Sequence, residues 1–150
     1  MKLYEHLNTL QEKVIYCDTD SVIYSAKPGE RKLPLGNYLG ELTNELDADD
    51  YITEFVSSGP KAYAYVTAQG HGCTKLKGFT LNHTNAQKIN YESMKMLVLE
   101  GGYITTFNPS KICRNKNDRT IYNVREEKKY QVVYDKRVVQ KDLSTLPFGY

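Results

Sequence analysis

The feature that most constrains the fold is residues 14–24, Val-Ile-Tyr-Cys-Asp-Thr-Asp-Ser-Val-Ile-Tyr. Its two arms, 14–16 and 22–24, consist of Val, Ile and Tyr, which favour β-strands. The short polar stretch between the arms is typical of a tight hairpin turn. Such a turn holds Asp18 and Asp20 close together on a rigid support. Because neighbouring carboxylates repel each other unless a cation offsets their charge, the pattern favours a divalent-metal site for phosphoryl transfer.

The stretch Tyr-Cys-Asp-Thr-Asp-Ser within this hairpin resembles the Y-x-D-T-D-S motif of family B DNA polymerases. In that family the motif is a hairpin of the palm domain that delivers carboxylates to two catalytic magnesium ions. The resemblance implies that Asp20 is the principal metal ligand and Asp18 the secondary one, both catalytic. It also implies that Tyr16 and Thr19 lie at the nucleotide-binding site. An ordinary polar turn is the alternative, since Asp is common in turns for backbone reasons.

Two further segments resemble motifs of the protein-primed branch of this family. Gly-Pro-Lys-Ala-Tyr-Ala-Tyr, which contains Lys61 and Tyr63, is similar to its K-x-Y motif, and Lys-Leu-Lys-Gly, which contains Lys75 and Lys77, to its K-x-K-G element. The resemblance implies that these side chains bind DNA and hold the primer strand near its growing end. Residues i and i+2 of a strand share a face, so each pair can point at one DNA strand. Surface lysines and a core tyrosine are the plainer interpretation.

The family's remaining motifs are not found in the sequence. Its exonuclease carboxylates, its D-x-x-S-L-Y-P palm motif and its nucleotide-gripping fingers helix should all precede the hairpin, and none is present. The resemblance is close at 14–24 and 59–78 and looser beyond residue 84, although the ending resembles the C-terminus of polymerases of DNA transposons and linear plasmids. We therefore expect a C-terminal palm-and-thumb piece of a polymerase that is catalytically incomplete alone.

The resemblance implies a DNA-directed DNA polymerase, a nucleotidyltransferase that adds deoxynucleotides from dNTPs to a primer 3′-hydroxyl in DNA replication. Its partners would be a DNA primer–template and a terminal protein whose hydroxyl accepts the first nucleotide. Mg²⁺ would be the cofactor, in a two-metal site completed by a carboxylate of the upstream palm motif. Two other hypotheses stay open: a non-catalytic DNA-binding remnant module, and a structural domain whose acidic hairpin binds nothing.

Charge is distributed unevenly along the chain, although the net charge is only +2. Residues 1–60 hold 5 Lys and Arg against 11 Asp and Glu, a net charge of −6, and residues 61–150 hold 15 against 7, a net charge of +8. An acidic part suits cation binding and a basic part suits a polyanion. The 13 tyrosines, several beside Lys or Arg, suit contacts with sugar and phosphate. Two solvated faces of one domain are the alternative interpretation.

The composition argues against several other classes of protein. Cys17, Cys73 and Cys113 are widely separated, and the three histidines do not complete a ligand set, so we expect no zinc site and no disulfide framework. No apolar run approaches membrane-spanning length, and the N-terminus lacks the pattern of a secretory signal. We expect an intracellular protein without a membrane partner, in a compartment that the sequence leaves unknown.

Periodicity and turn residues predict an α+β fold. In the first part we expect a helix over 2–11, the hairpin over 13–25, a loop over 26–36 and a helix carrying Leu39, Leu42 and Leu46. Strands are expected at 51–58, 61–67 and 73–81. A helix should run from a Thr84–Gln87 capping box to Leu99, before Gly101-Gly102. Short strands should follow at 103–107, 110–114, 119–124 and 130–139, with a hairpin tip at 115–119.

These elements suggest two parts. Residues 1–82 would be the C-terminal part of a polymerase palm with its catalytic β-hairpin, and residues 83–150 a small thumb-like subdomain of one helix and a sheet. The stability of a separate core of fewer than about 70 residues is marginal, so we expect the two parts to pack against each other.

Overall fold

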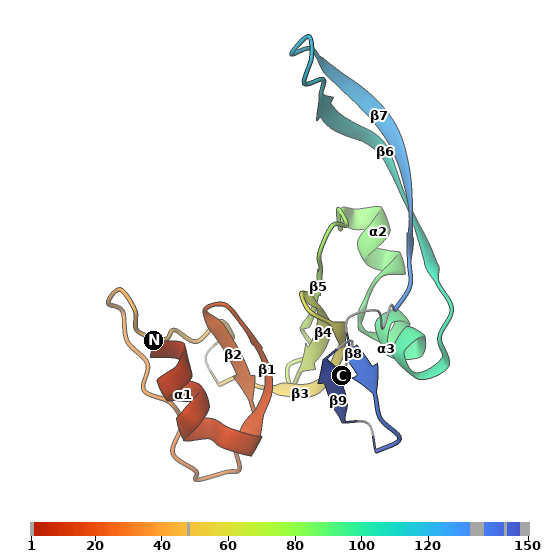
Figure 1. The fold of residues 1–150 in the computed structure, drawn as a ribbon. Coiled ribbons are helices and arrows are strands. Elements are labelled where there is room, and N and C mark those ends of the chain that lie inside the picture. The colour runs from red at the N-terminus through yellow and green to blue at the C-terminus, as the bar shows by residue number, and fades with distance from the viewer. Residues whose placement is uncertain (1, 48, 133–136, 143, 148–150) are drawn as a thin grey trace. The chain divides into compact units, whose positions relative to one another are not determined.

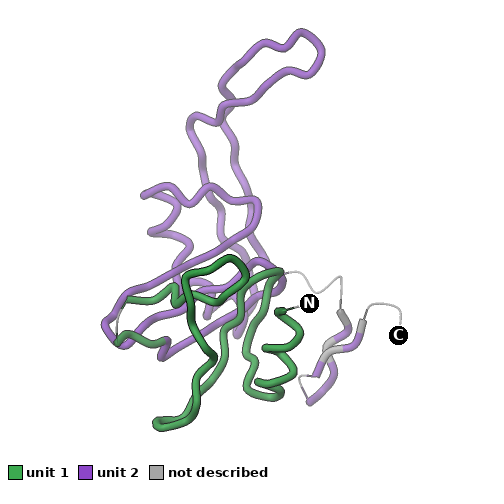
Figure 2. The backbone as a smooth tube through the Cα atoms, turned by 90° about the vertical axis from the view of Figure 1, so that its left-hand side faces the viewer, with its two compact units in different colours: residues 1–51 green, residues 52–150 purple. Residues whose placement is uncertain are grey.

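The structure is a computed structural model that describes residues 2–47, 49–132, 137–142 and 144–147. Its elements form an α+β fold of helices and small antiparallel sheets of two or three strands (Figure 1). The chain divides into two compact units, residues 1–51 and 52–150 (Figure 2).

The first unit contains the acidic hairpin. Helix α1 (Lys2–Leu10) continues into a 3-10 turn, η1 (Gln11–Lys13), which leads directly into strand β1 (Val14–Asp18). Strand β1 pairs antiparallel with β2 (Ser21–Tyr24). The helix expected at 2–11 and the hairpin expected at 13–25 are therefore confirmed.

The helix expected around Leu39–Leu46 is wrong. Residues 39–46, all of which the structure describes, form only turns, bends and an isolated bridge from Leu42 to Leu35. The side chain of Leu39 is fully exposed, so the three leucines do not form a buried stripe. Gly40 also adopts a φ of +86°, outside the helical region. A short helix is marginal in water unless its apolar face is packed, and here that packing is missing.

The second unit is built on a three-stranded antiparallel sheet in the order β3 (Ile52–Gly59), β4 (Ala62–Thr67), β5 (Gly72–Leu76). All three strands were expected, but β5 is shorter than the predicted 73–81. It ends because Gly78 adopts a φ of +83° and the N–H of Phe79 donates to the carbonyl of Leu76, which makes a turn.

The single helix expected up to Leu99 is two helices, α2 (His83–Lys88) and α3 (Tyr91–Glu100). Asparagines begin both. Asn82, rather than Thr84, is the N-cap of α2, and Asn90 forms a capping box with Ser93 at the start of α3. Because Asn90 is extended, the first helix cannot continue through it. The expected end at Gly101, which has a φ of +78°, is confirmed.

The core of the second unit lies between one face of the sheet and helix α3. Ala64, at the centre of β4, and Met94, on α3, are completely buried. The other buried apolar residues of this core are Ile89, Tyr91, Leu97 and Tyr130, and the partly buried ones around it are Val56, Val66, Leu76, Phe79, Leu81, Ile104 and Val132.

This core extends across residue 82, where the palm was expected to end and the thumb to begin. Strands β3–β5 and helix α3 share it, and the compact units divide between Tyr51 and Ile52. The physical reason is that the apolar face of the sheet is covered by α3, so neither element buries its apolar surface alone. Compact units do not identify a palm or a thumb, so the division into 1–82 and 83–150 stays a prediction.

Strands β6 (Ile104–Arg114) and β7 (Ile121–Tyr130) form a long antiparallel ribbon that projects from the core of the second unit (Figure 1). The strands expected at 103–107 and 110–114 are one strand with a register shift between Asn108 and Lys111. The expected tip is confirmed, and the N–H of Asn115 closes it by donating to the carbonyl of Thr120 at 2.9 Å.

The last described elements are β8 (Arg137–Val139) and β9 (Thr145–Pro147), which pair antiparallel. Part of the strand expected at 130–139 falls on 133–136 and lies outside the described residues. None of the helices that the structure describes is long and apolar enough to cross a membrane.

We expect Met94→Ala to lower the free energy of unfolding by about 2–5 kcal/mol, because it leaves a cavity in the core. The matched control is Met96→Ala on the same helix, where the side chain is 57% exposed and the expected cost is below about 1 kcal/mol. Urea unfolding followed by circular dichroism measures both. Equal losses in the two variants would contradict the core described above.

Candidate metal and nucleic-acid sites

The acidic turn is a two-residue connection between β1 and β2. Asp18 pairs with Ser21, so Thr19 and Asp20 form the turn itself. Thr19 adopts a φ of +37°, in the left-handed region that such tight hairpin turns use. The carbonyl of Asp18 accepts hydrogen bonds from the N–H of Asp20 and from the hydroxyl of Ser21. The hairpin therefore holds both aspartates at one end of a hydrogen-bonded support, as expected.

The two aspartates differ in their surroundings. Asp18 is half-buried, and its Oδ1 accepts a hydrogen bond of 3.1 Å from the Thr19 hydroxyl, while Asp20 is exposed. Tyr16 lies two residues before Asp18 on β1, so both side chains are on the same face of the strand. Tyr16 and Thr19, the expected nucleotide contacts, thus flank the carboxylate of Asp18.

Carboxylate oxygens are ligands that Mg²⁺ prefers, so the chemistry of this pair suits the expected cation. Within the part of the chain that the structure describes, however, no group of three or more His, Cys, Asp or Glu could hold a metal ion. The turn therefore offers two carboxylate ligands, and octahedral coordination needs further oxygen ligands such as water, phosphate oxygens or a carboxylate from elsewhere.

The expected DNA contacts lie in the second unit, with Tyr63 on β4 and Lys75 on β5. Tyr63 is paired directly with Lys75, so the two side chains share a face of the sheet. The ring of Tyr63 stacks on Phe55 at 5.9 Å and on Tyr65 at 6.4 Å between centroids. Because Ala64 lies between the two tyrosines and packs toward α3, this aromatic face is the one opposite the core.

One part of the expected geometry needs correction. Lys61 does not belong to β4: Gly59 pairs with Ala62, which leaves Pro60 and Lys61 as the turn, and Lys61 adopts a φ of +59°. The alternation of a strand therefore does not place Lys61 and Tyr63 on one face.

The four predicted DNA contacts nevertheless lie at the same end of the β4–β5 pair. The N–H of Lys77, just beyond β5, donates to the carbonyl of Lys61 at 3.0 Å, next to the pair of Tyr63 and Lys75. We refer to these four residues as the Tyr–Lys patch. Three lysines and a stacked tyrosine suit contacts with phosphate and sugar.

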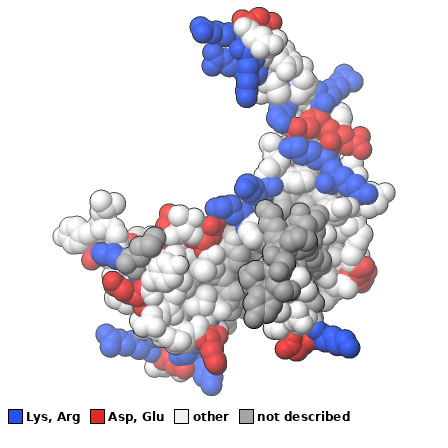
Figure 3. Space-filling view, in the orientation of Figure 1, with Lys and Arg blue, Asp and Glu red and all other residues white. Residues whose placement is uncertain are grey.

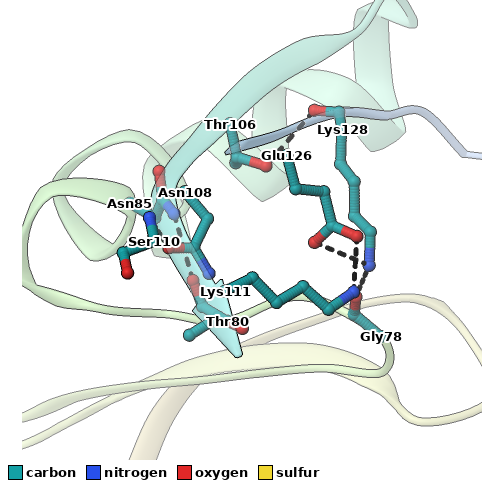
Figure 4. A network of polar contacts seen from close by, with 9 residues as sticks. All are labelled: Gly78, Thr80, Asn85, Thr106, Asn108, Ser110, Lys111, Glu126 and Lys128. Carbon is teal, nitrogen blue, oxygen red and sulfur yellow. Dashed lines mark hydrogen bonds and ion pairs between the residues drawn. The ribbon is translucent and has the colours of Figure 1, made fainter. Parts of the chain in front are cut away.

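A polar network that the sequence did not indicate joins the ribbon to the segment beside this patch (Figure 4). Lys128 on β7 donates to the carbonyl of Gly78 at 2.7 Å and lies 3.4 Å from Glu126. Glu126 also pairs with Lys111 on β6 at 2.5 Å. The hydrogen bond from Lys111 lowers the pKa of Glu126, and the same bond raises the pKa of Lys111. Because the strand register shifts between Asn108 and Lys111, the sequence alone does not indicate that Lys111 lies near Glu126.

A second anchor at the root of the ribbon is Asn85, a buried residue of α2 (Figure 4). Its side-chain amide donates to the carbonyl of Thr80 at 3.1 Å, and its Oδ1 accepts from the N–H of Phe107 at 3.3 Å. Asn85 therefore ties β6 to the segment that follows β5. Nothing in the spacing of the sequence pointed to this residue, since Asn is common at exposed helix starts.

No protein-family model matches the chain, and neither a curated protein nor a solved structure matches it. The resemblance to family B polymerases therefore rests on the motif residues in the acidic turn and in the Tyr–Lys patch.

Proposed function

We propose that this chain supplies the acidic hairpin and a primer-binding edge to a DNA-directed DNA polymerase of the protein-primed family B type. The observation that carries the proposal is the two-residue turn that holds Asp18 and Asp20 at the end of a hydrogen-bonded hairpin. The flanking Tyr16 and Thr19 match the same motif. Few other reactions need two carboxylates at a rigid turn, whereas nucleotidyl transfer does.

In this proposal the residues of the turn have separate roles. Bound Mg²⁺ would neutralise negative charge on the triphosphate and at the attacking 3′-hydroxyl. Asp20, which is exposed, would be the principal ligand, and Asp18, oriented by the hydroxyl of Thr19, the second one. Tyr16 would contact the incoming dNTP. Because the described residues supply no third carboxylate, we propose that residues 1–150 do not polymerise alone.

The Tyr–Lys patch would hold the primer strand. Lys61, Lys75 and Lys77 would contact phosphates as point charges, and Tyr63 would pack on a sugar. Stacking on Phe55 and Tyr65 limits the orientations open to the Tyr63 ring, which lowers the entropy lost on binding. A terminal protein would take the place of this primer in the first transfer.

A non-catalytic DNA-binding module is the second candidate. It is favoured by the location of the Tyr–Lys patch, which lies in a different compact unit from the acidic turn. Binding through the patch therefore needs no metal at Asp18 and Asp20, and such binding would depend steeply on salt.

A paramagnetic titration tests the metal site. Mn²⁺ added to the isotope-labelled chain should broaden the amide signals of residues 18–21 before those of residues 115–120. The second turn is an internal control, because it carries one carboxylate, Asp118, instead of two. Asp20→Asn should remove the difference by leaving one ligand. Equal broadening at both turns in the unaltered chain would contradict a built metal site.

A binding assay tests the Tyr–Lys patch. We expect Lys75→Gln and Lys77→Gln each to weaken binding of a primer–template and to reduce the slope of log K against log salt by about 1. Lys88→Gln, an exposed lysine in the last turn of α2, is the matched control and should change neither quantity. Asp20→Asn should also leave binding unchanged. Primer extension by the unaltered chain alone, with dNTPs and Mg²⁺, would refute the proposed incompleteness.

A further inference from the structure

The ribbon beyond its register shift, residues 111–125, exposes apolar side chains on one face. Ile112 pairs with Asn123 and Arg114 with Ile121, so these four side chains share a face, and Arg125 follows on the same side of β7. All five are exposed, and Ile112 and Ile121 are 77% and 75% exposed. On the opposite face Lys111, Cys113 and Val124 are half-buried, and Tyr122 is 48% exposed. We refer to the exposed set as the outer face of the ribbon.

The same segment is strongly cationic. Residues 111–125 hold five Lys and Arg against a single Asp, and Lys and Arg gather toward the far end of the ribbon (Figure 3). Among the described residues none of the ion pairs involves Arg114, Lys116, Arg119 or Arg125. The carboxylate of Asp118 accepts hydrogen bonds from the backbone N–H and the hydroxyl of Thr120, and these bonds stabilise the turn. This surface therefore suits a polyanion.

We propose that the outer face lies in the major groove of double-stranded DNA and contacts base edges. That groove is about 12 Å wide and admits a two-stranded β-ribbon, whose strands lie about 4.8 Å apart. The residue types match the base edges that this groove exposes. Arg114 and Arg125 can donate hydrogen bonds to guanine, Asn123 can form hydrogen bonds with adenine, and the isoleucines can contact the methyl group of thymine.

Other nucleic acids fit this face less well. The major groove of A-form RNA is too deep and narrow for side chains to read. Single strands are bound mostly by aromatic rings, and the outer face carries aliphatic side chains instead. The proposal goes beyond polymerisation, because a template-directed enzyme selects nucleotides by base pairing and needs no contact of its own with base edges.

The root of the ribbon supports such a role. Lys128 and Asn85 attach it to the segment that follows β5, so the ribbon leaves the core in a defined direction (Figure 4). An isolated two-stranded ribbon is marginal in water, and a groove that encloses its apolar side chains would stabilise it further. The outer face becomes acidic at Glu127, which pairs with Phe107 on the core side of the register shift. The proposed contact therefore ends there.

Selection from a randomised DNA duplex library tests the proposal. The full chain should enrich a sequence motif, in a duplex about 20 base pairs or two helical turns long. Replacing thymine by deoxyuridine in that duplex should weaken binding about threefold to fourfold for each contacted methyl group. Replacing guanine by 7-deazaguanine, which lacks the N7 acceptor, should weaken it further.

Matched variants show whether the outer face makes these contacts. Ile112→Ser combined with Ile121→Ser should abolish the sensitivity to deoxyuridine. Arg114→Gln combined with Arg125→Gln should abolish the sensitivity to 7-deazaguanine. Leu99→Ser, which removes an exposed leucine from α3, should leave both unchanged. Because the substituted side chains are exposed, the fold should survive, and circular dichroism checks this.

Several outcomes would overturn the proposal: no enriched motif, no effect of either base analogue, or equal affinity for the single strand. Sensitivity to deoxyuridine that survives in the double isoleucine variant would overturn it as well. Asp20→Asn should bind the selected duplex as the unaltered chain does. Failure of the metal site and failure of the groove contact are therefore distinguishable.

Discussion

The second unit depends on one contact, the packing of helix α3 on a single face of the β3–β5 sheet. Ala64 and Met94 meet in this layer and are completely buried. Because successive side chains of a strand alternate between faces, burial of Ala64 places Tyr63 and Tyr65 on the other side. The packing of α3 on the sheet therefore forms the core and also places the aromatic face, beside Lys75, on the opposite side of the sheet. The candidate DNA contacts follow from the way the sheet buries its apolar half.

The ribbon is attached by a different kind of interaction. Its root is held by hydrogen bonds from the side chain of Lys128 to the carbonyl of Gly78 and from the N–H of Phe107 to the side chain of Asn85. The ion pairs of Glu126 with Lys111 and Lys128 lie within the ribbon, and exposed ion pairs of this kind contribute little to stability. The buried Asn85 adds an anchor whose loss would leave a backbone N–H without its partner. Among the described residues, none of the ion pairs involves Arg114, Lys116, Arg119 or Arg125 of the distal ribbon, where few anions lie.

Much of the local structure could be predicted from the sequence, and the failures have physical causes. Helix α1, the acidic hairpin and the strands before residue 77 follow from periodicity and turn residues. The helix around Leu39 fails because its apolar residues have no surface to pack on. The capping box at Thr84 fails because Asn82 and Asn90 are better caps for the two helices that form. Lys61 was misplaced because a two-residue turn resembles the start of a strand when only the sequence is read.

The sequence by itself determined the acidic turn, because Val, Ile and Tyr arms around a short polar stretch form a hairpin through local interactions. Asp18 and Asp20 are brought together by residues that are nearly adjacent in the chain. Only the tertiary structure decided that β3–β5 and α3 share a core across residue 82, that Tyr63 faces away from it, and that Glu126 meets Lys111. These outcomes depend on burial and on strand register between distant segments, and the energy of such contacts appears only when those segments pack together.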